Sequence, residues 1–389
     1  MEEKYIIECL RAFLFEEELP PVPISLDWEE LFRKINSHLL AGFFAYQLKR
    51  PGKNIWPVEI VQRLHRVRLL SGMRGETYIR ELSRIIKAFQ SDDQKIILLK
   101  GWSLINLLYN GDASQRISSD IDILIPIESA KVGEKILRGQ GYVSDEPWIG
   151  FFRQYSINTP FAKSINDSPL VKSIVIELHW GLMHVPYLNN RIDFDGIFKR
   201  AVPLELAGEK MLALSLEDHF VYNCAHMLHH RHQFVLARWY ELALWIKLNA
   251  GELNWPAVVE RAREWRLSAG IQYACEVIEK LWPGIVPANW AVQAQQLRSG
   301  IVEKVIHRYE DAGNPNTRPL VVFATLPLHS KLGYLLKLTF PSSGYMTRHY
   351  GSAPMNFWPL LYITRYNRFF GFFKQLFTPR IRQSEKKDR

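Results

Sequence analysis

Cysteine is scarce in this 389-residue sequence, which contains only three. Cys9, Cys224 and Cys275 stand far apart, each in an apolar segment with helical spacing, and none belongs to a Cys-x-x-Cys pair. Thiols that are this few and this scattered argue against a disulfide framework. We therefore expect a cytoplasmic protein.

Long apolar runs are also missing. No stretch reaches the roughly 18 apolar residues that a membrane-spanning helix needs, and the first four residues lack the basic start of a signal peptide. We therefore expect no transmembrane segment. In segment 358–377, aromatic residues and leucines are interleaved with Arg365, Arg368 and Lys374. A basic amphipathic helix of this kind can lie on a membrane surface. Because such a stripe more often packs on its own domain, peripheral membrane contact is the weaker alternative.

Acidic residues are outnumbered, with 40 Asp and Glu against 49 Lys and Arg, which gives a net charge of +9. This balance favours polyanionic ligands such as nucleotide phosphates, nucleic acid or an anionic membrane surface. A mildly basic protein without any such ligand is equally compatible with it. The apolar content of 47% is ample for a packed core and argues against extensive disorder.

The most informative stretch is 118–126, where Asp120 and Asp122 alternate with Ile121, Ile123 and Ile125. This alternation predicts a β-strand with one apolar face. The two carboxylates lie on the other face, roughly 6.5–7 Å apart at Cα. They are close enough to share one divalent cation, or a pair of ions about 3.5–4 Å apart.

Two flanking segments complete the pattern. Upstream, the apolar run 96–99 leads into Lys100-Gly101-Trp102-Ser103 and then into a helical pattern. A strand that opens into a helix leaves backbone N–H groups free to bind phosphate. Downstream, segment 174–180 alternates again, with Glu177 and His179 on one face, so a third carboxylate joins the first two if these strands are neighbours.

Three motifs carry a family resemblance, namely Lys100-Gly101-x-Ser103, Arg116-x-x-x-Asp120-x-Asp122 and Glu177-x-His179-Trp180. Together they resemble the polymerase-beta-type nucleotidyltransferase superfamily and, within it, the bacterial family of uncharacterised nucleotidyltransferases. The resemblance is sharpest over 95–180. Family members usually carry Asp where this chain has Glu177. The resemblance implies a compact palm and the transfer of a nucleoside monophosphate from a nucleoside triphosphate to an acceptor.

We expect an α+β fold in which a small mixed β-sheet, the palm, has its helices on one side and is flanked by N-terminal and C-terminal helical regions. The predicted division is an N-terminal helical region 1–90, a nucleotidyltransferase core 91–190, a C-terminal helical domain 191–383 and a disordered basic tail 384–389. Apolar spacing predicts the individual elements. The predicted helices span 28–49, a segment starting near residue 57, 128–141, 212–249 and 255–281, and the further strands span 151–161 and 171–180.

In such a reaction the predicted catalytic residues and metal ligands are Asp120, Asp122 and Glu177. Asp120 and Asp122 would share Mg²⁺, with Mn²⁺ as an alternative, because hard cations prefer oxygen ligands. Glu177 would hold a second ion or take the proton of the acceptor hydroxyl. The residues expected to bind the nucleotide are Lys100, Gly101, Ser103, Arg116, Ser119, His179 and His226.

The roles expected of these nucleotide-binding residues differ. Gly101 lets the backbone approach the triphosphate, and the hydroxyl of Ser103 can donate to a phosphate oxygen. Lys100 and Arg116 are charge partners for the phosphates. His179, on the Glu177 face, points toward the cleft.

Histidine gathers in one helical segment at His219, His226, His229, His230 and His232. His226 and His230, at i and i+4, have the spacing of a zinc pair. The glutamate of a metalloprotease motif is absent, because Met227 follows His226. Structural or cleft-facing histidines are therefore favoured over a zinc hydrolase. His226 also falls where the resembled family tends to have a histidine.

The acceptor remains open among a small hydroxylated molecule, a sugar, a peptide or protein side chain, and tRNA. Large helical additions suggest an enclosed cleft, which favours a small molecule or a short side chain. No basic stripe interleaved with aromatics demands nucleic acid. The main rival interpretation is a non-catalytic nucleotide-binding scaffold or sensor on the same fold.

Overall fold

The computed structural model describes residues 1–49, 55–144, 156–310 and 318–340, together with the single residues 346, 362, 363 and 366. The chain divides into two compact units, one of Met1–Asp145 and Arg153–Thr325 and one of Glu146–Phe152 and Leu326–Arg389. The β-sheet lies in the first of these units, and helix α16 (Leu328–Thr339) lies in the second. The tail 384–389 and most of segment 358–377 are outside the described residues. The four-region division stays a prediction.

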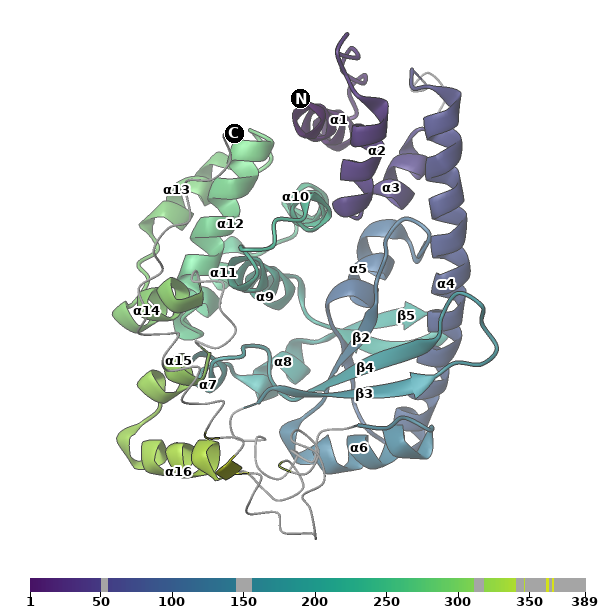
Figure 1. The fold of residues 1–389 in the computed structure, drawn as a ribbon. Helices are drawn as coiled ribbons and strands as arrows, with labels where there is room; N and C mark the ends of the chain where they lie inside the picture. The colour runs from purple at the N-terminus through teal and green to yellow at the C-terminus, as the bar shows by residue number, and fades with distance from the viewer. Residues whose placement is uncertain are drawn as a thin grey trace. The chain divides into compact units, whose positions relative to one another are not determined.

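The N-terminal region is helical, as predicted (Figure 1). Its helices are α1 (Glu2–Phe15), α2 (Trp28–Ser37), α3 (Ala41–Gln47) and α4 (Val58–Ser91). The prediction of one helix over 28–49 is wrong. The helix breaks between α2 and α3, where Leu39 takes a left-handed backbone with φ of 60°. A left-handed residue cannot continue a right-handed helix.

A six-stranded mixed sheet forms the palm. Its strands are β1 (Ile97–Leu98), β2 (Asp120–Leu124), β3 (Asn158–Ser164), β4 (Ser173–His179), β5 (Val202–Leu206) and β6 (Glu209–Ala213). Their spatial order is β3-β4-β2-β1-β6-β5. β2 pairs with β4 in parallel and with β1 antiparallel, so β2 lies in the interior of the sheet.

The hairpin of β5 and β6 corrects the expectation that residues after 190 are only helical. A two-residue turn of Ala207 and Gly208 joins the strands, and both residues have positive φ, 54° and 78°. Such a turn matches the twist of a tight hairpin. β6 then adds in parallel to β1 and extends the sheet.

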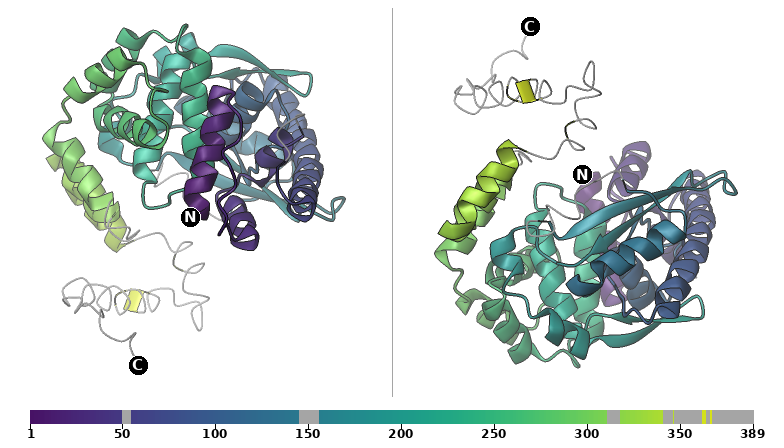
Figure 2. Two further views of the ribbon diagram at one scale, coloured as in Figure 1. Left: turned by 90° about the horizontal axis from the view of Figure 1, so that it is seen from above. Right: turned by 90° about the horizontal axis from the view of Figure 1, so that it is seen from below.

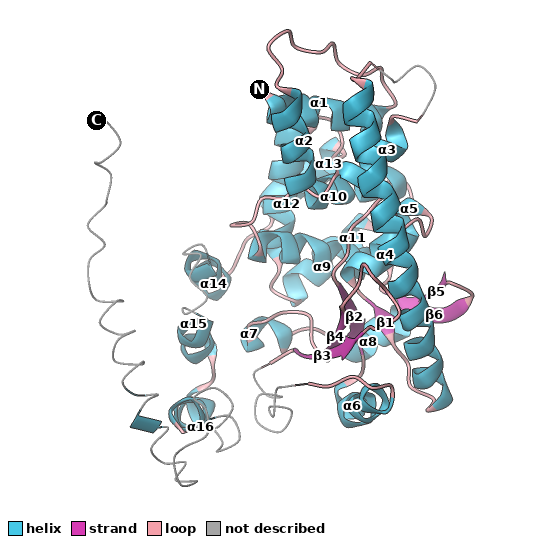
Figure 3. Ribbon diagram, turned by 45° about the vertical axis from the view of Figure 1, so that its right-hand side comes forward, coloured by secondary structure: helices cyan, strands magenta, loops and turns pink. Residues whose placement is uncertain are grey.

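Helices pack on the apolar face of the palm. Helix α6 (Ala130–Gly139), preceded by the short 3-10 helix η1 (Ile127–Ser129), lies against this face (Figures 1 and 3). The approach is close, because a Cβ on Gly133 would lie 3.2 Å from Leu178 and 3.4 Å from Phe89 at the end of α4. The view from below shows α6 across the strands (Figure 2, right).

Helices from both ends of the larger unit share one apolar core. After the short helices α7 (Pro186–Asn189) and α8 (Phe194–Arg200) come α9 (Leu216–His229), α10 (Leu236–Asn249), α11 (Trp255–Glu264), α12 (Ser268–Leu281), α13 (Ala288–Gln296), α14 (Ile301–Glu310) and α15 (Arg318–Thr325). The one or two helices predicted over 212–249 are two, α9 and α10, and they begin only after β6, whereas the pair predicted over 255–281 is present as α11 and α12. Phe43 of α3 packs on Tyr240 of α10 with ring centroids 4.7 Å apart, and Trp282 Nε1 donates to the Ile7 carbonyl.

Within the described residues, no helix combines the length and the apolar character needed to cross a membrane.

Candidate active site

The predicted carboxylates meet because β2 and β4 are neighbours. Asp122 stands directly opposite Glu177, and Asp120 stands opposite Val175, two residues earlier in the same parallel register. Side chains alternate along a strand, so all three carboxylates point to one face of the sheet. The apolar residues between them supply the opposite face, which is packed under α6.

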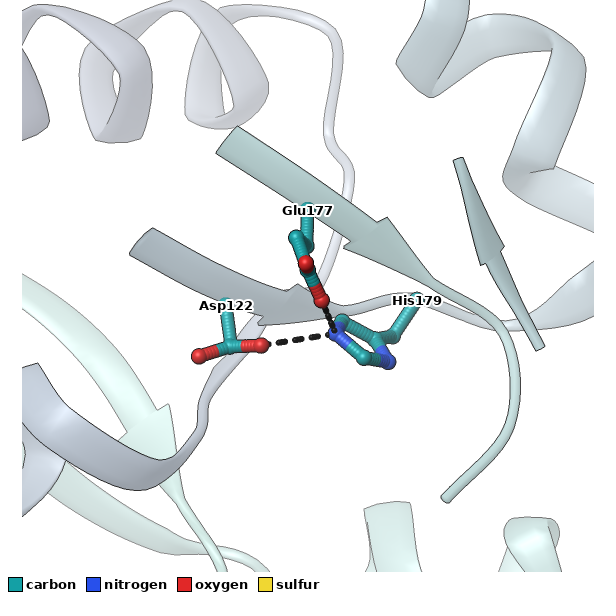
Figure 4. A group of neighbouring side chains, drawn as sticks. All are labelled: Asp122, Glu177 and His179. Carbon is teal, nitrogen blue, oxygen red and sulfur yellow. Dashed lines mark hydrogen bonds and ion pairs between the residues drawn. The ribbon is translucent and has the colours of Figure 1, made fainter. Parts of the chain in front are cut away.

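Asp122 is the most enclosed of the three, at 2% exposure. Its Oδ1 accepts a hydrogen bond from Lys100 Nζ over 2.6 Å and lies 2.8 Å from His179 Nε2. The same His179 nitrogen is 3.1 Å from Glu177 Oε2 (Figure 4). A protonated Nε2 therefore donates to both carboxylates. Ligand atoms of Asp122, Glu177 and His179 all lie within 4.8 Å of one another, a grouping that suits a metal ion.

The protonation of this group follows from its neighbours. Burial favours the neutral form of Asp122, but hydrogen bonds from His179 and Lys100 outweigh burial and hold its pKa below the ordinary range. The pKa of Asp120 is raised, first by burial and then by the charges of Asp122 and Glu177. Burial opposes the charge of His179, yet its two carboxylate partners raise its pKa. Asp122 is thus the permanent anion of the set.

Lys100 and Gly101 open helix α5 (Lys100–Tyr109) at the end of β1. Lys100 has a left-handed backbone, with φ of 44°, and extends its side chain to Asp122. Gly101 lies close to two side chains, because a Cβ here would collide with the Ser118 hydroxyl and lie 2.7 Å from Arg116 Nη1, so both would have to shift. The glycine thus lets α5 meet the loop that precedes β2.

Arg116 has a protein partner that the sequence did not suggest. Its Nε donates to Oε1 of Glu241 over 2.5 Å, and its Nη2 donates to Oε2 over 3.2 Å. Tyr109 OH also lies 3.4 Å from Oε1 of Glu241. Burial works against charge on Arg116, but Glu241 more than compensates and raises the pKa of the guanidinium. Arg116 therefore ties the loop before β2 to α10.

A cavity of about 350 Å³ lies beside these groups. Eight of the ten predicted site residues line it, namely Asp120, Asp122, Glu177, Lys100, Gly101, Arg116, Ser119 and His226. His179 is not in the lining and lies behind the two carboxylates that it contacts. Ser103 is not in the lining either, and its buried hydroxyl has no hydrogen-bond partner in the described part of the chain.

The sequence did not assign several residues of the cavity wall. Asn158, on β3, donates from Nδ2 to Oε2 of Glu177 over 2.7 Å. Asn223, His230 and Arg238 come from the helical segment with α9 and α10, opposite the sheet. The only available signal was that Arg238 and Glu241 lie one helical turn apart beside the histidine cluster. Their place in the cavity depends on long-range packing.

The histidine cluster forms a ladder of rings near this wall. Ring centroids are 4.4 Å apart for His226 and His230, and 4.8 Å apart for His229 and His230. The pKa of His226 is lowered well below its usual value, first by burial and then by nearby positive charge, and the same causes lower the pKa of His230 to about 3. Both imidazoles are neutral at pH 7. Among the described residues, the group of three or more converging ligands is the one at Asp122, not one built from these histidines.

A family model described as an uncharacterised nucleotidyltransferase matches residues 25–283, more than half of the chain. The chain belongs to this nucleotidyltransferase family. The match confirms the resemblance seen in the motifs, and its range includes the whole cavity lining. Membership in this transferase family implies a nucleoside triphosphate as substrate. A comparison with curated proteins found no match.

Proposed function

We propose that this nucleotidyltransferase is Mg²⁺-dependent, with Mn²⁺ as an alternative, and moves a nucleoside monophosphate from a nucleoside triphosphate to a hydroxyl acceptor with release of pyrophosphate. The observation that carries the proposal is the register of β2 and β4, which places Asp122 beside Glu177 and Asp120 on the same face. These carboxylates line a cavity of about 350 Å³. Three carboxylates at the wall of a cavity suit a metal-bound triphosphate.

The donor set fits magnesium. Asp122 and Glu177 offer oxygen atoms within one 4.8 Å group, and Asp120 adds a third carboxylate to the same cavity. Hard cations such as Mg²⁺ prefer these oxygens to the imidazole nitrogen of His179. When bound, the metal supplies neutralisation of phosphate charge and polarisation of the acceptor hydroxyl. We assign His179 to holding the two carboxylates in place.

The side chains divide the remaining work. Glu177 is less enclosed than Asp122, with its side chain 28% exposed against 3%, and is suited to accept the proton of the attacking hydroxyl. Lys100 reduces the repulsion among the carboxylates through its contact with Asp122. The backbone at Gly101, free of a side chain, is where the triphosphate approaches α5.

The acceptor that we favour is a small molecule, a sugar or a peptide or protein side chain. Helices α9 and α10 contribute the wall opposite the sheet, and such an enclosed cavity favours a small molecule or a short side chain as acceptor. A non-catalytic nucleotide-binding scaffold is the alternative, and the retention of all three carboxylates speaks against it. A hydrolase with zinc on the histidine cluster is less favoured, because the converging ligands in the described residues include two carboxylates.

Calorimetric titration of each nucleoside triphosphate, with and without Mg²⁺, tests the proposal. We expect Mg²⁺-dependent binding by the wild type and none by Asp120→Asn/Asp122→Asn. The matched control is Asp92→Asn/Asp93→Asn, which makes the same charge change at exposed positions after α4. A panel of hydroxyl acceptors then tests pyrophosphate release with the nucleotide that binds. If the double variant binds like the control, the carboxylate site is wrong, and metal-dependent binding without any transfer favours the scaffold.

A further inference from the structure

The cavity is lined by three acids and, beside them, by two arginines. Asp120, Asp122 and Glu177 lie on the strands, next to Lys100 at the start of α5. Arg116 comes from the loop before β2 and pairs with Glu241 of α10, the helix that also carries Arg238. A nucleoside triphosphate has a matching layout, since its α-phosphate meets metal at the carboxylates and its β- and γ-phosphates need positive charge farther along. The two arginines of the cavity are therefore candidates for binding these phosphates.

Arg116 and Arg238 differ in their hydrogen-bond partners. Arg116 donates hydrogen bonds to both carboxylate oxygens of Glu241. Arg238 lines the same cavity, but its Nη1 is buried and has no hydrogen-bond partner among the described residues. A buried guanidinium N–H without an acceptor is costly, and an anionic oxygen in the cavity would remove that cost. Arg238 thus has donor capacity that the protein itself does not use.

Electrostatics agree with this geometry. The pKa of Arg238 is lowered, first by burial and then by the charge of Arg116, and Glu241 and Asp120 only partly compensate. The neighbouring His226 and His230 are neutral and do not offset this positive charge. His230 Nδ1 is a second buried atom without a hydrogen-bond partner in the described chain. This part of the cavity has an excess of positive charge that favours an anion.

We propose that Arg238 is a substrate-binding residue that holds the β- and γ-phosphates of the nucleoside triphosphate. The inference rests on the proposed function and adds to it a residue for the leaving pyrophosphate. A guanidinium donates two parallel hydrogen bonds to a phosphate, which a hydroxyl acceptor cannot accept equally well. Arg238 is thereby a further charge partner for the phosphates, beside Lys100 and Arg116, for which the same role is predicted from the sequence.

Calorimetry with Mg²⁺ on Arg238→Gln provides the test. The probes are inorganic tripolyphosphate, the nucleoside triphosphate that the wild type binds best, and the corresponding monophosphate. We expect affinity for both triphosphate probes to fall about 10-fold or more, as for loss of a charge-assisted hydrogen bond, with the monophosphate affected less than about 2-fold. Arg238→Lys, which keeps the charge but not the fork, should lose less. Arg263→Gln, an exposed arginine of α11, is the matched control and should bind like the wild type.

The outcomes separate the two proposals. If the wild type binds a nucleoside triphosphate and Arg238→Gln binds it equally well, the Arg238 assignment is overturned and the proposed function stands. Equal losses for triphosphate and monophosphate overturn the assignment as well, because they indicate general damage to the cavity. If the wild type binds no nucleoside triphosphate with Mg²⁺, the proposed function itself fails. Thermal unfolding of each variant verifies its fold, and Arg238→Lys gives the result if Arg238→Gln does not fold.

Discussion

The Arg116 guanidinium donates to both carboxylate oxygens of Glu241, a residue 125 positions later in the chain. Both side chains are largely buried, with 17% and 4% exposure. The pair joins the loop before β2, which carries Asp120 and Asp122, to helix α10, which carries Arg238. The two walls of the cavity are thus linked by one ion pair.

Removing one partner of this pair should cost far more than removing a surface partner. We expect Glu241→Ala to lower the free energy of unfolding by about 3 kcal/mol, because it leaves the Arg116 charge buried without a counterion. The double variant Arg116→Leu/Glu241→Leu should lose less than the sum of its single variants. Urea unfolding measures both effects.

The control for this prediction is the exposed pair of Arg138 and Glu134 on α6. Glu134→Ala should cost less than about 1 kcal/mol, as is usual for surface ion pairs. Equal losses for Glu241→Ala and Glu134→Ala would contradict a structural role for the buried pair.

The strands that carry the carboxylates were readable from the sequence because their pattern is local. Asp120 and Asp122 alternate with isoleucines that pack under α6, and on β4 Glu177 and His179 alternate with Ile176 and Leu178. Alternation with period 2 depends only on which face is buried. The sequence could not show that β2 and β4 are neighbours in the sheet, because that pairing joins segments more than 50 residues apart.

The hairpin of β5 and β6 escaped prediction for a different reason. Each strand has only five residues, β5 contains Pro203, and the turn is Ala207-Gly208 instead of the more recognisable Asn-Gly or Asp-Gly. Pro203 is tolerated because β5 is an edge strand. Alternation of Leu204 and Leu206 was the available signal, and it is too short to outweigh the helical pattern that follows.

Side-chain partners were the least predictable part of the site. An arginine shortly before two aspartates, such as Arg116, looks like a phosphate ligand. Nothing in the neighbouring sequence indicates that Arg116 forms an ion pair with Glu241. Arg238, whose Nη1 has no hydrogen-bond partner in the described chain, could be recognised in the sequence only as a charged residue on a helix. Pairing across 125 residues depends on how α10 packs on α3 and α5, which single-sequence patterns do not encode.

A side chain at Gly101 should destabilise the protein. In Gly101→Ala the new Cβ would meet the Ser118 hydroxyl and Arg116 Nη1, so we expect a loss of about 1–3 kcal/mol in unfolding free energy from overpacking, together with weaker binding of nucleoside triphosphate. The additional change Ser118→Gly should recover part of both. Gly139→Ala is the matched control, since a Cβ there meets nothing within 4 Å. A stable Gly101→Ala with unchanged binding would refute the close-approach argument.

His219 should make the protein sensitive to acid. The ring is buried, neither nitrogen has a partner in the described chain, and burial lowers its pKa from 6.5 to about 4. As pH falls below 6.5, the unfolded chain takes up a proton that the folded one does not, so stability is lost between pH 6.5 and 4. The loss from this group should be about 2 kcal/mol by pH 5.

Urea unfolding at pH 8 and pH 5 measures this contribution. The difference between the two pH values should shrink by that amount in His219→Leu, whatever the absolute stability of the variant. The exposed His232, changed to Leu, should leave the difference unaltered. The same pH dependence in His219→Leu and the wild type would show that other groups cause the acid sensitivity.

Asn158 should affect the proposed metal site through its contact with Glu177. Its Nδ2 donates to Oε2 of Glu177 over 2.7 Å, and this bond fixes the orientation of the Glu177 side chain. Loss of such an outer partner typically weakens metal binding about 10–100-fold. We therefore expect Asn158→Ala to need about 10–100-fold more Mg²⁺ for half-maximal nucleotide binding, with little change in thermal stability.

Asn166→Ala, in the exposed turn between β3 and β4, supplies the control. A Glu177→Asp variant should depend less on Asn158, because the shorter acid has fewer rotamers to fix. If Asn158→Ala and Asn166→Ala show the same Mg²⁺ dependence, Glu177 is positioned by His179 alone.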